Sequence, residues 1–332
     1  MSTVLKSSDV PLAGAFEAIF FDLDGVVYRG RAPVNGAVAA IGAISAGAFG
    51  FLTNNANRTP QAIAEHLKSL GIATTADAVV TSAQAIAGVI ASDLPPGSPV
   101  FVVGGEGLRA AVRDVGLEPV SQRESSLAVA QGYSPDLGWR DLAEVSYAVQ
   151  SGMPWYVSNL DLTIPTDAGI APGNGSLVQA VATATGATPV VAGKPFAPLF
   201  DAAKSRFGVE APLMVGDRLD TDIRGANQAS LDSLMVLTGV NSLSDLLTAS
   251  TVERPTFISA DLAGLQHVHL PVTVEANKSR CGTAIAQIEG NTLHVSQAGK
   301  DSTQSLRALV TLGWQFVDET NEPLQLDARI DL

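Results

Sequence analysis

The sequence predicts an α/β protein built around a parallel β-sheet. Short apolar runs typical of buried strands, at 18–21 and 49–53, alternate with stretches of helical periodicity at 37–46 and 60–70. Gly71 closes the second helical stretch, as glycine commonly does at a helix end. Strands that alternate with helices in this way form βαβ units, in which neighbouring strands run parallel.

The order of the later elements predicts that the first domain is interrupted by an inserted one. Within 78–191 the alternation starts again, which indicates a second α/β domain. Its predicted strands lie at 99–103, 127–130 and 155–158. The first domain, 14–77, resumes at 192–265. Its later strands are predicted at 213–215 and 233–237.

The two ends of the chain differ from these domains. Residues 266–332 change to short alternating runs, near 268–272 and 292–295, with one helix near 302–312. This pattern predicts a small α+β appendage. Residues 1–13 are expected to form a flexible N-terminus.

Composition disfavours several classes of protein. The 332 residues include 20 basic and 33 acidic side chains, and the formal net charge of −13 repels nucleic acid and anionic membranes. No stretch approaches the roughly 20 apolar residues of a membrane span, and the N-terminus lacks an export pattern. The single cysteine, Cys281, suits a reducing compartment. We therefore expect a cytoplasmic protein without nucleic-acid or membrane partners, and self-association stays open.

The most informative motif is the stretch Phe20-Phe21-Asp22-Leu23-Asp24-Gly25, where a predicted strand ends in two carboxylates. Ligands of open α/β sheets bind beyond the carboxyl ends of the strands. Strand alternation points Asp22 and Asp24 the same way, so that both can share a cation beside a phosphate. A calcium loop would need further oxygen ligands, whereas Val26 and Val27 follow.

Three more polar segments follow predicted strands. Thr53 and Asn54 offer a hydroxyl and amides that suit phosphate oxygens, and Lys194 supplies a cation. Asp217 and Asp222 lie in an acidic loop that can complete an oxygen-rich Mg²⁺ site. Each segment alone has an ordinary explanation, such as helix capping. Their joint occurrence at strand ends points to phosphoryl chemistry.

With these motifs the chain, from about residue 15 to 262, resembles the haloacid dehalogenase-like superfamily of aspartate-nucleophile phosphatases. Thr53 lies 29 positions after Asp24, whereas Lys194 lies 141 positions after Thr53, which leaves room for a domain only in the second interval. This spacing and the segment Pro172-Gly173-Asn174-Gly175 are similar to the type IIA cap class. With the appendage included, the chain is most similar to actinobacterial glycerol 3-phosphate phosphatases. The resemblance implies a Rossmann-like parallel-sheet core with an inserted α/β cap domain.

The resemblance also implies a mechanism, a Mg²⁺-dependent phosphomonoester hydrolysis through an aspartyl-phosphate. Asp22 is the implied nucleophile and Asp24 the implied general acid and base, with Lys194 as the third catalytic residue. The implied metal ligands are the Asp22 carboxylate, the Asp24 carbonyl and Asp217, while Asp222 orients the metal's water or Lys194. The phosphate-binding set is Asp22, Asp24, Thr53, Asn54 and Lys194.

Glycerol 3-phosphate is the predicted substrate, and phosphoglycolate, pyridoxal phosphate and sugar phosphates are alternatives. Asn159 and Asp161 follow a predicted cap strand and are candidate substrate-pocket residues, although an Asx turn explains them equally well. Phosphoglycolate carries a carboxylate that needs a basic partner. The cap's arginines are few, and most of them fall on predicted helix faces. They are Arg109, Arg113, Arg123 and Arg140.

Three further readings compete with a phosphatase. The first is an NAD-binding oxidoreductase, because Gly104-Gly105-Glu106-Gly107 follows a predicted strand, but such turns are common in α/β domains. The second is a zinc-binding tail, but its residues lack the spacing of a closed site. Those residues are His267, His269, His294 and Cys281. The third keeps the fold and is a dehalogenase or a phosphomutase. Asp24 argues against a dehalogenase, which the resemblance implies would not need an acid there. The motifs do not separate a phosphomutase from a phosphatase, because it shares the phospho-aspartate step.

Overall fold

The computed structural model describes residues 5–44, 47–166 and 168–327, and the chain divides into two compact units. The first unit consists of Met1–Phe49 and Phe207–Leu332, and the second consists of Gly50–Arg206. No helix among the described residues is long and apolar enough to cross a membrane. The predicted domain boundaries, including 78 and 191 for the inserted domain, stay a prediction.

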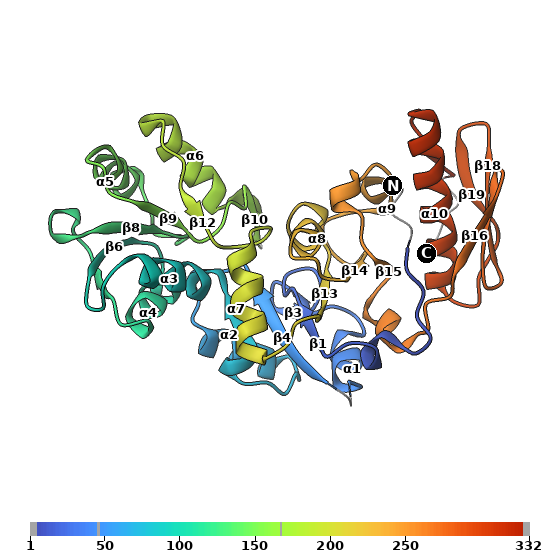
Figure 1. Ribbon diagram of the computed structural model, residues 1–332, viewed down its shortest axis with the longest axis horizontal. Helices are drawn as coiled ribbons and strands as arrows, with labels where there is room; N and C mark the ends of the chain where they lie inside the picture. The colour runs from blue at the N-terminus through green and yellow to red at the C-terminus, as the bar shows by residue number, and fades with distance from the viewer. Residues whose placement is uncertain (1–4, 45–46, 167, 328–332) are drawn as a thin grey trace. The chain divides into compact units, whose positions relative to one another are not determined.

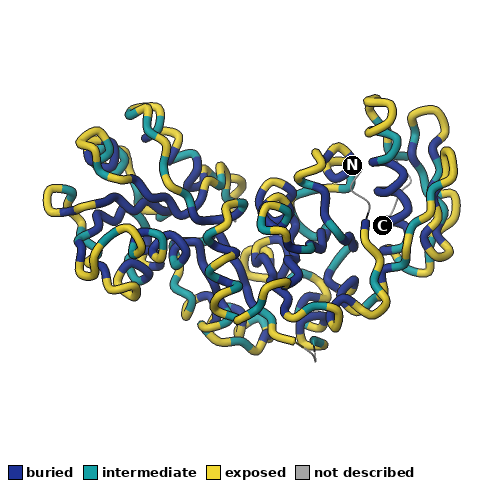
Figure 2. Tube along the Cα trace, viewed as in Figure 1, coloured by how far each residue is buried: buried dark blue, intermediate teal, exposed yellow. Residues whose placement is uncertain are grey.

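The first unit contains a parallel sheet of buried strands in the order β15-β14-β13-β1. These strands are β1 (Ala18–Phe21), β13 (Leu213–Gly216), β14 (Ser233–Val236) and β15 (Phe257–Ser259). Every residue of the four strands is buried, so helices and loops cover both faces, and Figure 2 shows the strands in the buried colour. Burial on both faces explains why the sequence of these strands is apolar throughout.

Short helices and a two-stranded hairpin lie between the strands of this sheet. The hairpin is β2 (Tyr28–Arg29) with β3 (Ala32–Pro33). The helices are η1 (Leu12–Gly14), α1 (Ala37–Gly42), η4 (Leu219–Ile223), α8 (Arg224–Gln228), α9 (Leu243–Leu247), η5 (Thr251–Glu253) and η6 (Leu262–Gln266). The described part of the N-terminal segment packs against the unit. Leu5 is buried, the Lys6 amide donates to the Thr256 carbonyl at 3.0 Å, and the Ser8 amide donates to the His269 carbonyl at 2.9 Å. The predicted flexibility of residues 1–13 stays a prediction, because these contacts do not measure motion.

The predicted appendage forms a second sheet of the first unit, in the order β16-β17-β18-β19-β20. Its strands are β16 (Val272–Glu275), β17 (Lys278–Cys281), β18 (Ala284–Glu289), β19 (Thr292–Gln297) and β20 (Gln325–Leu326). The first four are antiparallel, and β20 pairs with β19 in parallel. The long helix α10 (Ser302–Thr320) lies along this sheet, as Figure 1 shows.

Two appendage elements differ from the sequence prediction. The first strand begins at Val272 rather than near 268, because Pro271 has no amide hydrogen and His269 is buried between other elements. Helix α10 continues past Leu312 to Thr320. It passes through Gly313, where a Cβ would lie 2.4 Å from a methyl carbon of Leu247. Glycine therefore permits close packing here and does not end the helix.

The second unit contains a parallel sheet in the order β12-β9-β8-β6-β7. The strands are β6 (Pro99–Val103), β7 (Glu118–Val120), β8 (Ala128–Gln131), β9 (Trp155–Val157) and β12 (Val190–Val191). The helices are α3 (Ser82–Asp93), α4 (Glu106–Asp114), α5 (Trp139–Gln150) and α6 (Asn174–Thr185). Helices α3 and α4 cover one face and α5 and α6 the other, as Figure 1 shows. This sheet, with helices on both faces, confirms the second α/β domain of the predicted fold class.

The strand β4 (Ala48–Thr53), which belongs to the second unit from Gly50 on, runs parallel to β5 (Val79–Thr81) with Phe51 opposite Val79. β5 therefore pairs with a strand of the predicted core, although it follows residue 78, where the inserted domain is predicted to begin. The unit's remaining elements are α2 (Pro60–Ser69), η2 (Ala76–Ala78), η3 (Arg123–Ser125), the hairpin β10 (Thr163–Thr166) and β11 (Gly169–Pro172), and α7 (Ala197–Phe207).

Candidate active site

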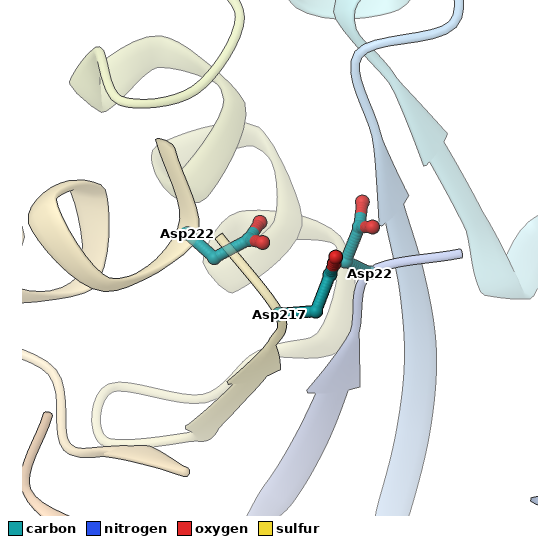
Figure 3. A group of neighbouring side chains, drawn as sticks. All are labelled: Asp22, Asp217 and Asp222. Atoms are coloured by element: carbon teal, nitrogen blue, oxygen red, sulfur yellow. The ribbon is translucent and has the colours of Figure 1, made fainter. Parts of the chain in front are cut away.

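Three buried carboxylates meet at the carboxyl ends of neighbouring strands in the first unit. Asp22 directly follows β1, Asp217 directly follows β13, and Asp222 lies in η4, a short π-helical segment. One oxygen of each carboxylate lies within 4.8 Å of the others, and all three residues are buried. Figure 3 shows the three side chains converging from these separate elements. The pairing of β1 with β13 explains the convergence, because parallel strands end at the same edge.

The backbone around Asp217 is arranged to admit its carboxylate. One oxygen, Oδ2, accepts a hydrogen bond from the Val240 amide at 2.7 Å. Gly25 packs against the same carboxylate with φ of +91°, and a Cβ there would lie 2.5 Å from Asp217 Oδ2. Gly25 is therefore required for both its backbone conformation and its small size.

Asp222 is fixed by the loop that carries it. Its Oδ2 accepts a hydrogen bond from the Arg218 amide at 3.2 Å, so the acidic loop folds back on itself. The neighbouring Asp220 faces solvent and pairs with the Arg218 guanidinium through bonds of 3.1 and 2.8 Å. The loop thus separates two buried acids from one solvated acid, Asp220, which the motif analysis left out of the site.

The carboxylate cluster has the donor set of a divalent cation site. Carboxylates buried so close together repel each other, and a bound cation offsets this repulsion. An all-oxygen set suits a hard ion such as Mg²⁺, whereas zinc usually takes nitrogen or sulfur ligands. Asp24 is exposed, and its side chain does not belong to the cluster. The predicted metal ligand of Asp24 is its backbone carbonyl oxygen, not its side chain. This role stays a prediction.

The second unit carries the hydroxyl, amide and cation of the predicted phosphate site. Thr53 ends β4, is buried, and accepts a hydrogen bond from the Asn55 amide on its Oγ1 at 3.1 Å. Lys194 is only 3% exposed, and its Nζ donates to the Leu52 carbonyl at 3.2 Å. The structure thus brings Lys194 to the end of β4, close in space to residues that precede it by about 140 positions in sequence.

Asn54 connects this lysine to both candidate pocket residues. Its Nδ2 donates to Asp161 Oδ1 at 3.0 Å, and its carbonyl accepts from Asn159 Nδ2 at 2.7 Å. Asn159 Oδ1 in turn accepts from the Asp161 amide at 3.1 Å, which is the Asx turn considered as the alternative. Asn174, which donates to the Asn159 carbonyl at 2.8 Å, was not among the predicted site residues. Its Pro-Gly-Asn-Gly setting was the only signal.

The glycine-rich turn after β6 has a packing role. A Cβ on Gly105 would lie 1.8 Å from Asn57 Oδ1, and one on Gly107 would lie 2.5 Å from the Arg58 carbonyl. The Gly107 amide donates to the Asn57 carbonyl at 2.9 Å. The chain's own loop at 56–58 therefore lies against the turn where a dinucleotide would need to approach.

The histidines of the appendage and Cys281 are engaged separately. His269 is buried between the Gly264 carbonyl, 3.0 Å from its Nε2, and Arg307 Nη1, 3.3 Å from its Nδ1. The Cys281 thiol lies 3.6 Å from the Leu270 carbonyl. Within the described residues these groups form no cluster able to hold a metal, and the acidic cluster is the candidate that the chain offers.

Comparison with known proteins identifies the family to which this site belongs. A family model of haloacid dehalogenase-like hydrolases matches residues 19–118, and a HAD-hydrolase-like model matches residues 191–265. A D-glycerol 3-phosphate phosphatase of Mycobacterium tuberculosis is 48% identical over 255 residues, which cover 76% of this chain and 72% of that protein. The chain belongs to the haloacid dehalogenase-like hydrolase family. The matched residues include every core motif of the sequence prediction.

Other relatives extend the similarity of this haloacid dehalogenase-like hydrolase. A crystal structure of a glycerol phosphate phosphatase from Mycobacterium tuberculosis in complex with magnesium has a TM-score of 0.84 and 41% identity. The alignment covers 98% of this chain and 96% of that one, so it includes the C-terminal appendage. An acid sugar phosphatase of Staphylococcus epidermidis is 32% identical over 251 residues, which cover 74% of this chain and 95% of that protein. The relatives confirm the predicted resemblance to this phosphatase family.

Proposed function

We propose that this chain is a Mg²⁺-dependent phosphatase that hydrolyses glycerol 3-phosphate to glycerol and phosphate. The observation that carries the proposal is the buried cluster of Asp22, Asp217 and Asp222 in a chain that resembles a glycerol phosphate phosphatase over nearly its whole length. The predicted small phosphate-ester substrate follows from that family membership. A cytoplasmic location and the absence of nucleic-acid partners remain part of the proposal.

In the proposed reaction Asp22 is the nucleophile. Its carboxylate attacks phosphorus in line and forms an aspartyl-phosphate while the bond to the glycerol oxygen breaks. Asp24 gives a proton to that departing oxygen and then removes a proton from the water that hydrolyses the aspartyl-phosphate. The exposure of Asp24 suits this role, because it allows the proton to exchange with solvent.

The remaining residues are assigned to binding the phosphate group and the metal. Thr53, Asn54 and Lys194 are assigned to the phosphate oxygens, where a hydroxyl, an amide and an ammonium stabilise the charge that builds up in the transition state. Asp22, the Asp24 carbonyl and Asp217 would hold Mg²⁺, with Asp222 orienting the metal's water or Lys194. When bound, the ion supplies positive charge that offsets the repulsion between carboxylate and phosphate.

The hydrogen bonds and ion pairs of the arginines in the inserted domain favour a substrate whose phosphate is attached to an uncharged alcohol rather than to one that carries a carboxylate. A phosphoglycolate phosphatase needs a basic partner for the second anionic group of its substrate. Most of these arginines already have partners within the second unit. They are Arg109 with the Val102 carbonyl at 2.9 Å, Arg113 with Glu106 at 3.6 Å and Arg123 with Glu144 at 2.8 Å.

The test is a phosphate-release assay with purified protein and Mg²⁺ on a panel of glycerol 3-phosphate, phosphoglycolate, pyridoxal phosphate and several sugar phosphates. The expected result is the highest kcat/KM on glycerol 3-phosphate. The Asp22→Asn protein, purified in parallel, controls for contaminating phosphatases. A much higher kcat/KM on phosphoglycolate or a sugar phosphate would overturn the substrate assignment, and no release from any ester would overturn the phosphatase assignment.

A further inference from the structure

The backbone amide and the backbone carbonyl of Lys194 are both hydrogen-bonded to one side chain, that of Asn54. Asn54 Oδ1 accepts from the Lys194 amide at 2.8 Å, and Asn54 Nδ2 donates to the Lys194 carbonyl at 3.1 Å. Two bonds from one planar amide leave the lysine backbone little freedom to move. The Nζ bond to the Leu52 carbonyl ties the other end of the lysine to the same segment. The position of the Lys194 ammonium therefore depends on where Asn54 lies.

Two further asparagines fix Asn54. Asn159 Nδ2 donates to the Asn54 carbonyl at 2.7 Å, and Asn174 Nδ2 donates to the Asn159 carbonyl at 2.8 Å. This asparagine network, Asn174, Asn159 and Asn54, joins the start of α6, the segment after β9 and the end of β4. The three residues are 1%, 4% and 9% exposed. Hydrogen bonds shielded from water in this way are well suited to fix positions.

The two polar atoms of the Asn174 side chain differ in their hydrogen bonding. Its Nδ2 makes one hydrogen bond, but its Oδ1 is buried without a partner among the described residues. A buried acceptor without a partner is unfavourable, so the two halves of this amide oppose each other in the free energy of folding. A residue kept for stability alone would be expected to satisfy both halves. The arrangement instead fits a residue whose Nδ2 has to hold the Asn159 carbonyl in place.

We propose that Asn174 and Asn159 are positioning residues for Lys194 and act on it through Asn54. The inference rests on the proposed function, in which Lys194 binds phosphate oxygens. It gives Asn159 a different role from the substrate contact considered in the sequence analysis. Its Nδ2 and Oδ1 are already bonded to the Asn54 carbonyl and the Asp161 amide.

The first test compares Asn174→Ala with Tyr156→Phe. The control removes one partly buried hydrogen bond elsewhere in the same unit, the 2.8 Å bond from Tyr156 Oη to Asp93. We expect Asn174→Ala to lower kcat/KM on glycerol 3-phosphate about 10- to 100-fold, which is the range for a small misplacement of a catalytic group. Its melting temperature should fall no more than that of Tyr156→Phe, which should keep kcat/KM within about twofold of wild type.

The second test asks whether the effect passes through Lys194. Isothermal titration with inorganic phosphate and Mg²⁺ measures Kd without turnover for wild type, Asn174→Ala, Lys194→Ala and the double variant. We expect each single change to weaken phosphate binding, and the double variant to bind as weakly as Lys194→Ala alone. Asn174→Ser replaces Asn174→Ala in both tests if the alanine variant does not fold.

The outcomes separate this inference from the proposed function. Unchanged kcat/KM in Asn174→Ala, or additive losses of phosphate affinity in the double variant, would overturn the positioning role while leaving an active phosphatase. A wild-type protein that releases phosphate from no ester on the panel would instead overturn the proposed function.

Discussion

Asp22 and Asp24 are two residues apart, yet their surroundings differ. Asp22 is buried in the carboxylate cluster, whereas Asp24 is exposed at the turn before Tyr28. A nucleophile benefits from a fixed, desolvated position, and an acid that must be reprotonated in each cycle benefits from contact with water. The different exposure of these two acids thus agrees with the different steps assigned to them.

We expect Asp24→Asn to lower kcat on glycerol 3-phosphate by about 10²- to 10⁴-fold, the usual contribution of a positioned acid. The loss of kcat/KM, which reports on formation of the aspartyl-phosphate and not on its hydrolysis, should be much smaller with p-nitrophenyl phosphate, because its leaving group departs without being protonated. Steady-state assays on both substrates measure the difference. Asp220→Asn, which changes the solvated acid paired with Arg218, serves as the control and should stay within about threefold of wild type. Equal losses of kcat/KM on both substrates would contradict the role as an acid.

Through His269, the stability of the appendage should depend on pH. Burial lowers the pKa of His269 from 6.5 to about 4, and the charge of Arg307 acts in the same direction, while the hydrogen bond to the Gly264 carbonyl opposes it. In the unfolded chain this histidine takes up a proton below about pH 6.5, but in the folded chain it does so only near pH 4. The folded state is therefore penalised progressively as the pH falls through this window.

The shift corresponds to a loss of about 3 kcal/mol of unfolding free energy between pH 6.5 and 4. Urea unfolding of wild type and His269→Gln across this range, followed on the transition of the first unit, measures it. The variant cannot take up this proton, so its stability should fall less steeply than that of wild type. Parallel slopes for the two proteins would show that His269 is not responsible.

At the scale of elements, the C-terminal half of α10 forms hydrogen bonds to the rest of the first unit. Arg254 is 3% exposed and makes two bonds to the Asp318 carboxylate, of 2.7 and 2.6 Å. Its guanidinium also lies 4.9 Å from the centre of the Trp314 ring, and the Trp314 indole donates to the Leu246 carbonyl at 2.8 Å. These contacts combine a two-point ion pair with a cation–π contact, so α10 is held by directional bonds as well as by apolar packing.

We expect Asp318→Asn to lower the unfolding free energy of the first unit by about 1–3 kcal/mol, because it leaves the buried guanidinium without a charged partner. The range is below that for a fully buried pair, since Asp318 is 30% exposed. Glu144→Gln breaks the more exposed pair with Arg123 in the second unit and should cost less than about 1 kcal/mol. Equal losses in urea unfolding would mean that burial of Arg254 adds nothing.

Particular residues explain which elements could be predicted. The strand before Asp22 could be predicted because all four of its residues are apolar and the strand is buried on both faces. The length of α10 was not, because the reason for Gly313 is a contact with Leu247 from a distant part of the chain. The roles of Asn54 and Asn174 were hidden for the same reason. Their hydrogen bonds join segments far apart in sequence, and a motif carries no information on which amide atom bonds to which carbonyl.

At the scale of the whole molecule, a net charge of −13 opposes the approach of an anionic ester. Affinity for phosphate must then come from local groups, namely Lys194, backbone amides and a bound cation. The carboxylate cluster increases this dependence, since without a cation it adds three buried negative groups near the ends of β1 and β13. Binding of the metal should thus affect the stability of the protein as well as its activity.

We therefore expect EDTA to abolish phosphate release and Mg²⁺ to restore it, with a rise in melting temperature that depends on Mg²⁺ concentration. A ligand that binds only the folded state adds about 2.7 kcal/mol at 100 times its Kd, and a unit of roughly 150–250 residues gains about 2–4 °C for each kcal/mol. Scanning calorimetry should place the rise in the transition of the first unit, and Asp217→Asn should remove it.

Ca²⁺ should raise the melting temperature without supporting turnover, because its looser coordination lets Asp22 bind the metal through both oxygens and so misdirects the attacking one. Full activity with Ca²⁺, or a Mg²⁺-dependent rise that persists in Asp217→Asn, would contradict the assignment of the cluster as the metal site.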